Sequence, residues 1–358
     1  TSPPRPTPFA RKGRTPMPLF RDLRASLHTL LLVALVSLSL LPGAAAARQA
    51  TPAAVAADSL AAATAWLLAQ QDASGGFPGY SGELDAGVTT DAVMALAAAA
   101  DTDPGAEAAI ENAMTYLAAN GEAYARTGAG QAAKLALAAV AGGRNPRSFV
   151  GVDLFDAMQA PPTSSVENPI AGIWGDSLYA HALVMLAFSA MGELPPDSAL
   201  EPLRATQGAD GGWAFDGSTA AGAADSNTTS MIIQALVAAG FGDSDLIPPA
   251  LAFLETLRAP DGSGFAYGPG APLTADSNST ALVAQAQIAA NEDASGALAA
   301  LAAFQLPDGS LRYMTADTDP NLLATVQGIP ALAGKALPVV TGCPAGGEAT
   351  AHCVLLAA

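Results

Sequence analysis

The sequence has few basic residues, histidines and cysteines, and each shortage excludes a class of function. Lys and Arg number 15 against 32 acidic residues, which gives a formal net charge of −17. A surface this acidic repels phosphate backbones and anionic lipids, so we do not expect the protein to bind nucleic acid. The sequence contains three histidines and two cysteines. With so few soft ligands, we expect no metal and no other cofactor.

Both cysteines, Cys343 and Cys353, lie near the carboxyl end. In an exported protein, such a pair is typical of a disulfide that closes a small terminal loop. A zinc site is the alternative, but His352 is the only histidine nearby and a fourth ligand is missing.

Aromatic residues are also scarce, at 6% of the chain, although 51% of the chain is hydrophobic. Alanine supplies most of that apolar count. It loses the least side-chain entropy in a helix, and β-branched residues are few, so the composition favours closely packed helices over strands. The sequence therefore predicts an all-α fold.

The first 47 residues have the three-part pattern of an export signal. Arg21 and Arg24 precede an apolar run from Leu30 to Leu41, and an Ala-x-Ala site follows at 45–47. We expect Met17 to be the true start and the mature protein to be secreted. An uncleaved amino-terminal anchor is the alternative, and it would be the protein's only contact with a membrane.

Two stretches repeat the same plan, one from Gln207 to Gly240 and the other from Arg258 to Asn291. Each has a glycine-rich turn that ends on an aromatic residue, then a loop, then an Asp-Ser-Asn run that opens an apolar helix. Similar helix starts recur along the chain at intervals of 41 to 51 residues, which is typical of a helical-hairpin repeat. They lie at Asp85, Arg126, Asp176, Asp225, Asp276 and Asp317.

These repeats predict six helical hairpins. The pairs are 53–71 with 89–100, 107–119 with 130–141, 152–159 with 177–191, 197–206 with 228–239, 246–257 with 279–290, and 295–304 with 321–333. Neither end carries a polar capping repeat, so we expect closure into an (α/α)6 toroid over 52–335 rather than an open solenoid. The second helix of each pair would form the inner wall, and 336–358 would be a short tail with the disulfide.

The repeat motif resembles that of the terpenoid cyclase and protein prenyltransferase superfamily, which has prenyltransferase and squalene oxidase repeats. It stands here as WLLAQQDASGGF at Trp66 to Phe77 and as LRATQGADGGW at Leu203 to Trp213. The resemblance implies an α/α toroid, but that fold hosts unrelated functions.

The known activities of that superfamily need motifs that are missing here. Cyclases of the squalene type use an Asp-x-Asp-Asp acid run, whereas the sequence has only DTDP, at Asp101 and again at Asp317. Prenyltransferases hold zinc with Asp, Cys and His, but His181 is the only histidine of the predicted toroid. The Gly-Cys-Gly-Glu-Gln run of thioester domains is also missing. The chain is most similar in character to the exported, non-catalytic transcobalamin and intrinsic factor branch, although we expect no counterpart of their second, β-rich domain.

An acidic residue that precedes a helix caps its free N–H groups, and this role alone would explain the recurring aspartates. In a closed ring, however, the inner helices would begin at the same rim, where polar groups would surround one mouth of the cavity. The candidate ligand-binding residues are Asp85, Asp176, Asp225, Asn227, Asp276, Asn278 and Asp317, with Tyr179 and His181 on an inner helix.

We therefore expect a secreted, non-enzymatic toroid with no catalytic residue. It would bind a small molecule, with a corrinoid as one candidate, or an extracellular protein partner. The alternatives are a divergent cyclase or prenyltransferase-type enzyme of the same superfamily, a hydrolase that uses two of the rim carboxylates, and a structural module of the cell surface.

Overall fold

The computed structural model describes residues 52–160 and 170–340. The chain divides into one unit from Thr1 to Gln49 and another from Ala50 to Ala358, and the description below concerns the second unit alone. The expected export signal at 1–47 and the expected disulfide between Cys343 and Cys353 lie outside the described residues. Within those residues, no helix is both long and apolar enough to span a bilayer.

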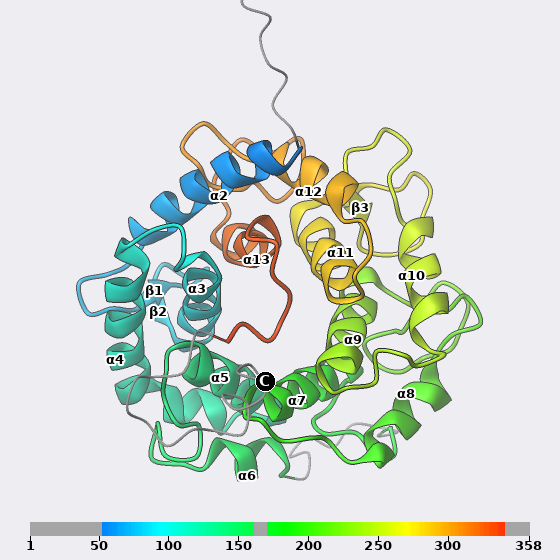
Figure 1. Cartoon of the computed structure of the whole chain (residues 1–358), viewed down its shortest axis with the longest axis horizontal. Helices are drawn as coiled ribbons and strands as arrows, with labels where there is room; N and C mark the ends of the chain where they lie inside the picture. The colour runs from blue at the N-terminus through cyan, green and yellow to red at the C-terminus, as the bar shows by residue number, and fades with distance from the viewer. Residues whose placement is uncertain (1–51, 161–169, 341–358) are drawn as a thin grey trace, which may run out of the picture. The chain divides into compact units, whose positions relative to one another are not determined.

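The described residues form twelve α-helices in two concentric layers, which confirms the predicted all-α toroid of six hairpins (Figure 1). The outer layer contains α2 (Pro52–Leu68), α4 (Gly105–Ala125), α6 (Leu154–Met158), α8 (Leu200–Thr206) with the preceding 3-10 turn η1 (Asp197–Ala199), α10 (Ile247–Thr256) and α12 (Ser295–Ala302). The inner layer contains α3 (Ala86–Ala99), α5 (Ala129–Ala141), α7 (Leu178–Ala190), α9 (Ser226–Ala238), α11 (Ser277–Ala289) and α13 (Leu322–Leu332).

One glutamine in the repeat motif, at Gln71, Gln207 and Gln305, joins each of three hairpins to the next outer helix. The Gln207 side chain donates to the carbonyl oxygens of Gly211 and Leu246, at 2.8 and 2.9 Å. Gln305 makes the same pair of bonds to Gly309 and, across the ends of the ring, to Ser59. The ring therefore closes through the same junction that joins its neighbouring repeats.

The glycine turn has no room for a side chain. Gly309 has a φ of 94°, and a Cβ there would collide with the carbonyl oxygen of Ala62 in α2. Gly211 has a φ of 92°, and a Cβ there would collide with the carbonyl oxygen of Pro249. The double glycine of the motif is thus the point where one hairpin touches the next.

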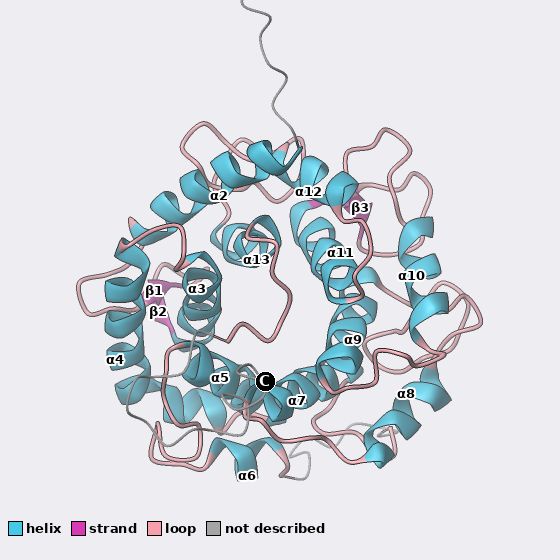
Figure 2. Ribbon diagram, viewed as in Figure 1, coloured by secondary structure: helices cyan, strands magenta, loops and turns pink. Residues whose placement is uncertain are grey.

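Most inner helices begin at a side-chain cap, as the sequence predicts for Asp85, Asp225 and Asp276. Short hairpins stand at two of these starts: β1 (Phe77–Pro78) with β2 (Leu84–Asp85), and β3 (Phe265–Ala266) with β4 (Ala275–Asp276) (Figure 2). The buried residue after each glycine turn, which we call the wedge, donates its backbone N–H to a threonine one turn into the helix. The pairs are Phe77 with Thr89, Trp213 with Thr229, Phe265 with Thr280, and Leu311 with Thr325.

The structure corrects three local predictions. The stretch 120–125, expected in a turn, continues α4 to Ala125, because Gly121 lets the helix pass against Leu135 and Val150. The cap of α7 is Ser177 rather than Asp176, since its hydroxyl accepts from the backbone N–H of Ala180. Likewise α13 is capped by Asn321 rather than Asp317.

Candidate functional site

The ring surrounds a small central cavity of about 80 Å³. Each inner helix contributes the residue six positions after its capping position, because that position faces the ring axis in every repeat. These residues are Asp91, Lys134, Leu183, Met231, Leu282 and Gln327. The rest of the lining is Met94, Tyr179, Gln285, Val326, Pro330 and Leu337. The inner helices are regular and equivalent, so one register places all six side chains in the same layer.

One side of the cavity carries a buried charge pair. Lys134 Nζ lies 2.6 Å from Asp91 Oδ2, and the two side chains are 24% and 12% exposed. Burial works against the charge on Lys134, but the adjacent Asp91 carboxylate more than offsets it and raises the Lys134 pKa above its usual range. Burial also raises the pKa of Asp91, while Lys134 acts in the opposite direction. Because both partners stabilise the charged state of the other, we describe the resting site as an ion pair.

Two buried tyrosines lie in the field of this pair, and one of them, Tyr179, lines the cavity. Burial raises the pKa of Tyr179 to about 12, so its hydroxyl keeps its proton and can donate. Burial likewise raises the pKa of Tyr124, and Lys134 opposes that shift. Both hydroxyls interact electrostatically with the Asp91–Lys134 pair.

The opposite side of the cavity is apolar, and a polar spot lies between that side and Asp91, because α13 packs against both α11 and α3. Leu183, Met231 and Leu282 form the apolar wall. Gln285 donates from Nε2 to the backbone carbonyl of Gln327, 3.0 Å away. Buried Oε1 of Gln327 has no hydrogen-bond partner in the described structure, which leaves an acceptor beside the cavity. A molecule bound here would meet charge at one end and hydrocarbon over most of its length.

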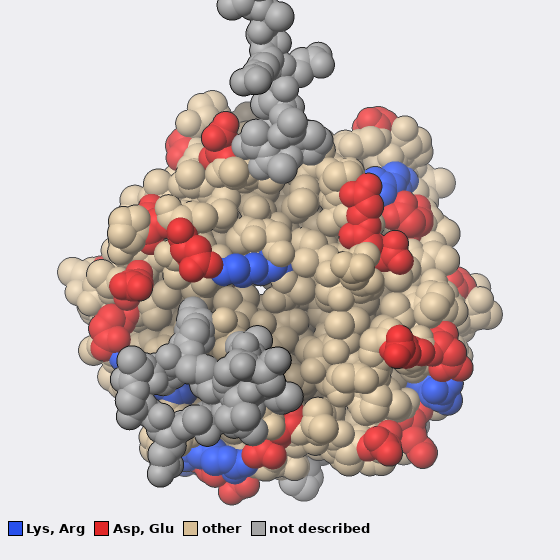
Figure 3. Space-filling model, viewed as in Figure 1, with Lys and Arg blue, Asp and Glu red and all other residues tan. Residues whose placement is uncertain are grey.

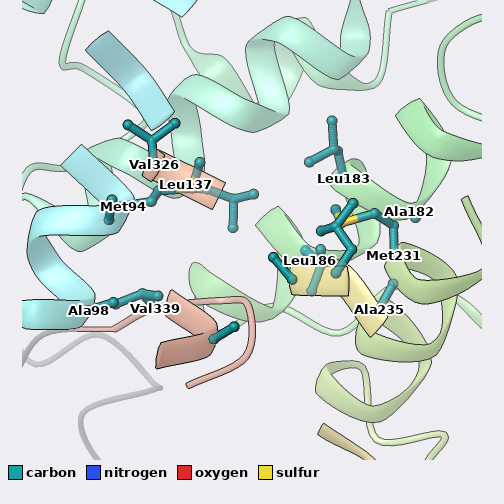
Figure 4. Close-up of a cluster of buried hydrophobic side chains, with 14 of the residues drawn as sticks. Met94, Ala98, Leu137, Ala182, Leu183, Leu186, Met231, Ala235, Val326 and Val339 are labelled. Atoms are coloured by element: carbon teal, nitrogen blue, oxygen red, sulfur yellow. The ribbon is translucent and has the colours of Figure 1, made fainter. Parts of the chain in front are cut away.

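The mouth at the carboxyl ends of the inner helices is crossed by the segment Lys335–Val340, which we call the strap. Figure 1 shows the chain after α13 running across the opening of the ring. Leu337 lines the cavity, and its backbone N–H donates to Oε1 of Gln234 on α9 at 2.9 Å. Val339 is 5% exposed and belongs to the same buried cluster as Ala98 (Figure 4). In the space-filling view, only a narrow opening remains at the ring centre (Figure 3).

The predicted rim residues occupy the amino ends of the inner helices, where most of them are engaged in local hydrogen bonds. Asp225 and Asp276 are each 3% exposed, and burial raises the pKa of both. Asn227 and Asn278 each accept from the preceding serine hydroxyl. Oδ2 of Asp317 accepts from the backbone N–H of Met314 and so holds a loop.

Asp85 and Asp176 are the exposed members of the predicted set. Asp85 nevertheless uses Oδ1 to cap α3 through the backbone N–H of Val88 at 2.7 Å. Asp176 lies just outside the first turn of α7. The structure therefore brings the predicted residues to one mouth of the ring but does not gather them into one cluster around the central cavity, which only Tyr179 lines.

His181 is buried away from the cavity and holds two segments together. Nδ1 accepts from the backbone N–H of Trp174 at 3.1 Å, and Nε2 lies 3.0 Å from the carbonyl oxygen of Ala199. Its ring stacks on Trp174 with a centroid distance of 5.1 Å. Burial lowers the His181 pKa to about 4, so the ring is neutral at physiological pH. Its contacts show a structural role.

Sequence reasoning missed both the central layer and a set of exposed aromatic residues. The predicted helix starts locate Asp91, which lies six positions after Asp85, but they miss Lys134, because α5 begins after Gly128 and not at the predicted Arg126. The aromatic residues stand two or three positions after the wedges. They are Tyr80, Phe215, Tyr267 and Tyr313, at 88, 52, 53 and 41% exposure. In the part of the chain that the structure describes, no three His, Cys, Asp or Glu residues are placed to hold a metal ion.

No protein-family model matches the chain, and no curated protein matches it. Solved structures do match. The apo type II terpene cyclase MstE from Scytonema aligns with 18% identity and a TM-score of 0.58, covering 78% of this chain and 98% of the cyclase. An inactive variant of the alpha-1,6-mannanase GH76A of Salegentibacter sp. HEL1_6, bound to alpha-1,6-mannotriose, aligns with 12% identity and a TM-score of 0.55, covering 78% and 98%. At these identities the likeness shows the α/α-toroid fold alone.

The expectation of a non-enzymatic binder is contradicted by these comparisons. The matched toroids include the cyclase MstE bound to its substrate and to its product, and glycosidases. They agree better with the enzymatic alternative than with a carrier. The transcobalamin and intrinsic factor branch receives no support from them. The physical reason for the error is that missing family motifs exclude particular mechanisms, whereas an acid–base pair can be built from residues far apart in sequence.

Proposed function

We propose that the protein is a divergent terpenoid cyclase-type enzyme that acts on a largely apolar, isoprenoid-like substrate in the central cavity. The observation that carries this proposal is the Asp91–Lys134 pair, which faces the apolar wall of Leu183, Met231 and Leu282 across the cavity on the ring axis. A buried ion pair is costly to desolvate and adds little stability, so its presence there favours a functional role.

Asp91 is the group we assign to proton transfer. As a carboxylate it stabilises positive charge that develops on a hydrocarbon chain, and it can then take a proton from the carbon next to that charge. The C–H bonding electrons become a double bond of the product, and Asp91 passes the proton to solvent. A proton from solvent, added to a substrate double bond, generates the cation, so the net reaction is an isomerisation. Because the Asp-x-Asp-Asp acid run is missing, we assign Asp91 to proton removal and not to the first protonation. Lys134 holds the carboxylate charged and in place.

The test is turnover of linear isoprenoids by the purified protein, with products separated by mass. Asp91→Asn keeps the shape of the side chain but removes the base, and we expect activity to fall by about 10²- to 10⁴-fold. Asp58→Asn is the matched control, because Asp58 is exposed on α2. Full activity of Asp91→Asn would contradict the assignment, and no turnover of any isoprenoid by the parent protein would contradict the substrate class.

The pH profile adds a second readout. The base works only when ionised, so activity should fall as the pH drops through the raised pKa of Asp91. Lys134→Met removes the cation that opposes this shift, so the acidic limb of the profile should move to higher pH. An unchanged limb in that variant would show that Asp91 is not the titrating group.

A second candidate is hydrolysis of a carbohydrate at the mouth formed by the amino ends of the inner helices. The exposed aromatic residues favour it, because sugar rings stack on such side chains, and two of the matched toroids hold a bound sugar, alpha-1,6-mannotriose in one and glucose in the other. Tyr267 lies close to Asp225, since the backbone N–H of Ser226 donates to the Tyr267 carbonyl at 2.7 Å. Release of sugar from alpha-1,6-mannotriose, lost in Tyr267→Ala but not in Asp91→Asn, would favour this candidate over the first.

We also propose that the protein acts outside the cell, on the basis of the export pattern at 1–47. Fractionation of expressing cells, followed by amino-terminal sequencing of the soluble external protein, tests this. Recovery of the intact amino terminus in the membrane fraction would indicate the uncleaved anchor instead.

A further inference from the structure

The central cavity is too small, as it stands, for the substrate class proposed above. A single water occupies about 10–15 Å³ of such a volume, so 80 Å³ accommodates about six waters. An isoprenoid with two or more five-carbon units has at least about ten heavy atoms. Either the substrate is smaller or part of the lining moves.

The strap is the part of the lining that can move without disturbing the ring. Every other lining residue belongs to an inner helix that is packed on both sides by neighbouring helices, whereas Leu337 follows the last helix. A second hollow, of about 370 Å³, lies against the strap. It is lined by Ser189, Ala238, Lys335, Ala336, Pro338, Val339 and Val340. Strap residues thus line both the cavity and this hollow.

Beyond the backbone hydrogen bond from Lys335 to Pro330 at the end of α13, the strap is fastened by three contacts that involve side chains. Nζ of Lys335 pairs with Asp101 at 3.1 Å, where Asp101 is 85% exposed. The backbone N–H of Leu337 donates to a side-chain amide, that of Gln234, instead of to a helix backbone. The side chain of Val339 is the buried apolar anchor.

We infer that the strap is a displaceable closure of the central cavity and that Leu337 sets the largest substrate the closed site admits. Displacing Lys335–Val340 joins the cavity to the neighbouring hollow and gives an elongated site. A bound chain would then place one end at Asp91 and Lys134 and extend the other toward Ser189 and Ala238. The substrate class rests on the proposed function, but the closure does not.

The closure is tested by chemical access to the cavity in the full chain. Met231→Cys places a thiol in the cavity wall, and its rate of reaction with a maleimide is measured by intact mass. The same assay on the parent gives the background from Cys343 and Cys353. Gln234→Leu, added to Met231→Cys, removes the acceptor for Leu337, and we expect labelling to become about five- to tenfold faster.

The matched control is Gln287→Leu in the same Met231→Cys background. Gln287 lies on the inner helix α11 and bonds to Glu255 instead of the strap. We expect it to leave the labelling rate unchanged. Val339→Ala is the second strap variant, used if Gln234→Leu folds poorly, and should also accelerate labelling. Equal labelling rates in the parent background and in folded strap variants would overturn the closure.

Ligand size separates this inference from the proposed function. Binding of geraniol and geranylgeraniol is measured for Leu337→Ala and for Leu194→Ala, a control at a residue that is 76% exposed. We expect Leu337→Ala alone to gain affinity for the longer alcohol relative to the shorter one. Faster labelling in strap variants without binding of either alcohol would support the closure and contradict the substrate class. Equal gains in both leucine variants would overturn the role of Leu337.

Discussion

The two mouths of the ring are built differently, although the same six inner helices form both. At the amino ends, repeated elements fix the chain: a buried wedge, a threonine that accepts the wedge N–H, and a capping side chain at most of the helix starts. At the carboxyl ends, a single non-repeated strap covers the opening. The amino mouth is therefore part of the repeated ring structure. The carboxyl mouth is covered by a segment whose displacement we expect to leave the stability of the ring nearly unchanged.

The largest expected effect comes from breaking the repeated mouth. Trp213 is fully buried, and its Nε1 donates to the carbonyl oxygen of Leu203 at 2.8 Å. Trp213→Ala should lower the free energy of unfolding by about 3–5 kcal/mol, because it removes a large buried side chain and leaves a cavity. Urea denaturation measures the change. Phe215→Ala, at a residue 52% exposed two positions away, is the control and should cost well under half as much. Similar losses of unfolding free energy in the two variants would show that the buried wedge contributes no more to stability than an exposed aromatic residue.

The same contrast separates what the sequence predicts from what it does not. The hairpins and the caps at Asp225 and Asp276 follow from glycine turns and helix starts, which are local signals that repeat. The Asp91–Lys134 pair was not found, because the two residues are 43 positions apart and each looks like an ordinary charge on its own helix. The predicted repeat register does not align them either, because it starts the second inner helix at Arg126, whereas α5 begins after Gly128. The strap has no counterpart in the other repeats, so no comparison within the sequence could reveal that Leu337 reaches the cavity.

The next largest effect on stability is expected at His181, whose hydrogen bonds join α7 to Trp174 and Ala199. His181 is neutral and accepts from Trp174, and its pKa falls from 6.5 to about 4 on burial. A lowered pKa means that the folded state disfavours the proton. The stabilising contribution is therefore complete above pH 6.5 and is lost as the pH falls from 6.5 towards 4, by up to about 3 kcal/mol.

Unfolding by urea at a series of pH values measures this loss. His181→Gln keeps two polar atoms but does not titrate, so its stability should change less between pH 6.5 and 4 than that of the parent. The two proteins should become more alike at the acidic end. Parallel curves for the parent and the variant would assign the acid sensitivity to other groups.

The smallest effect on stability is expected at the strap, and its size is what distinguishes the two mouths. The pair between Lys335 and Asp101 is exposed, so Lys335→Ala should change the free energy of unfolding by about 0–1 kcal/mol, and added salt should reduce even that difference. Hydrogen exchange at the Leu337 amide is the sensitive measurement, because that N–H is held by Gln234 alone. We expect exchange at the Leu337 amide to be faster in Lys335→Ala. Exchange at the Trp213 amide, which donates to the Thr229 hydroxyl, should not change. If exchange became faster at both amides, the strap would open only when the ring itself opens. The strap would then be as much a part of the ring structure as the caps and wedges at the amino mouth.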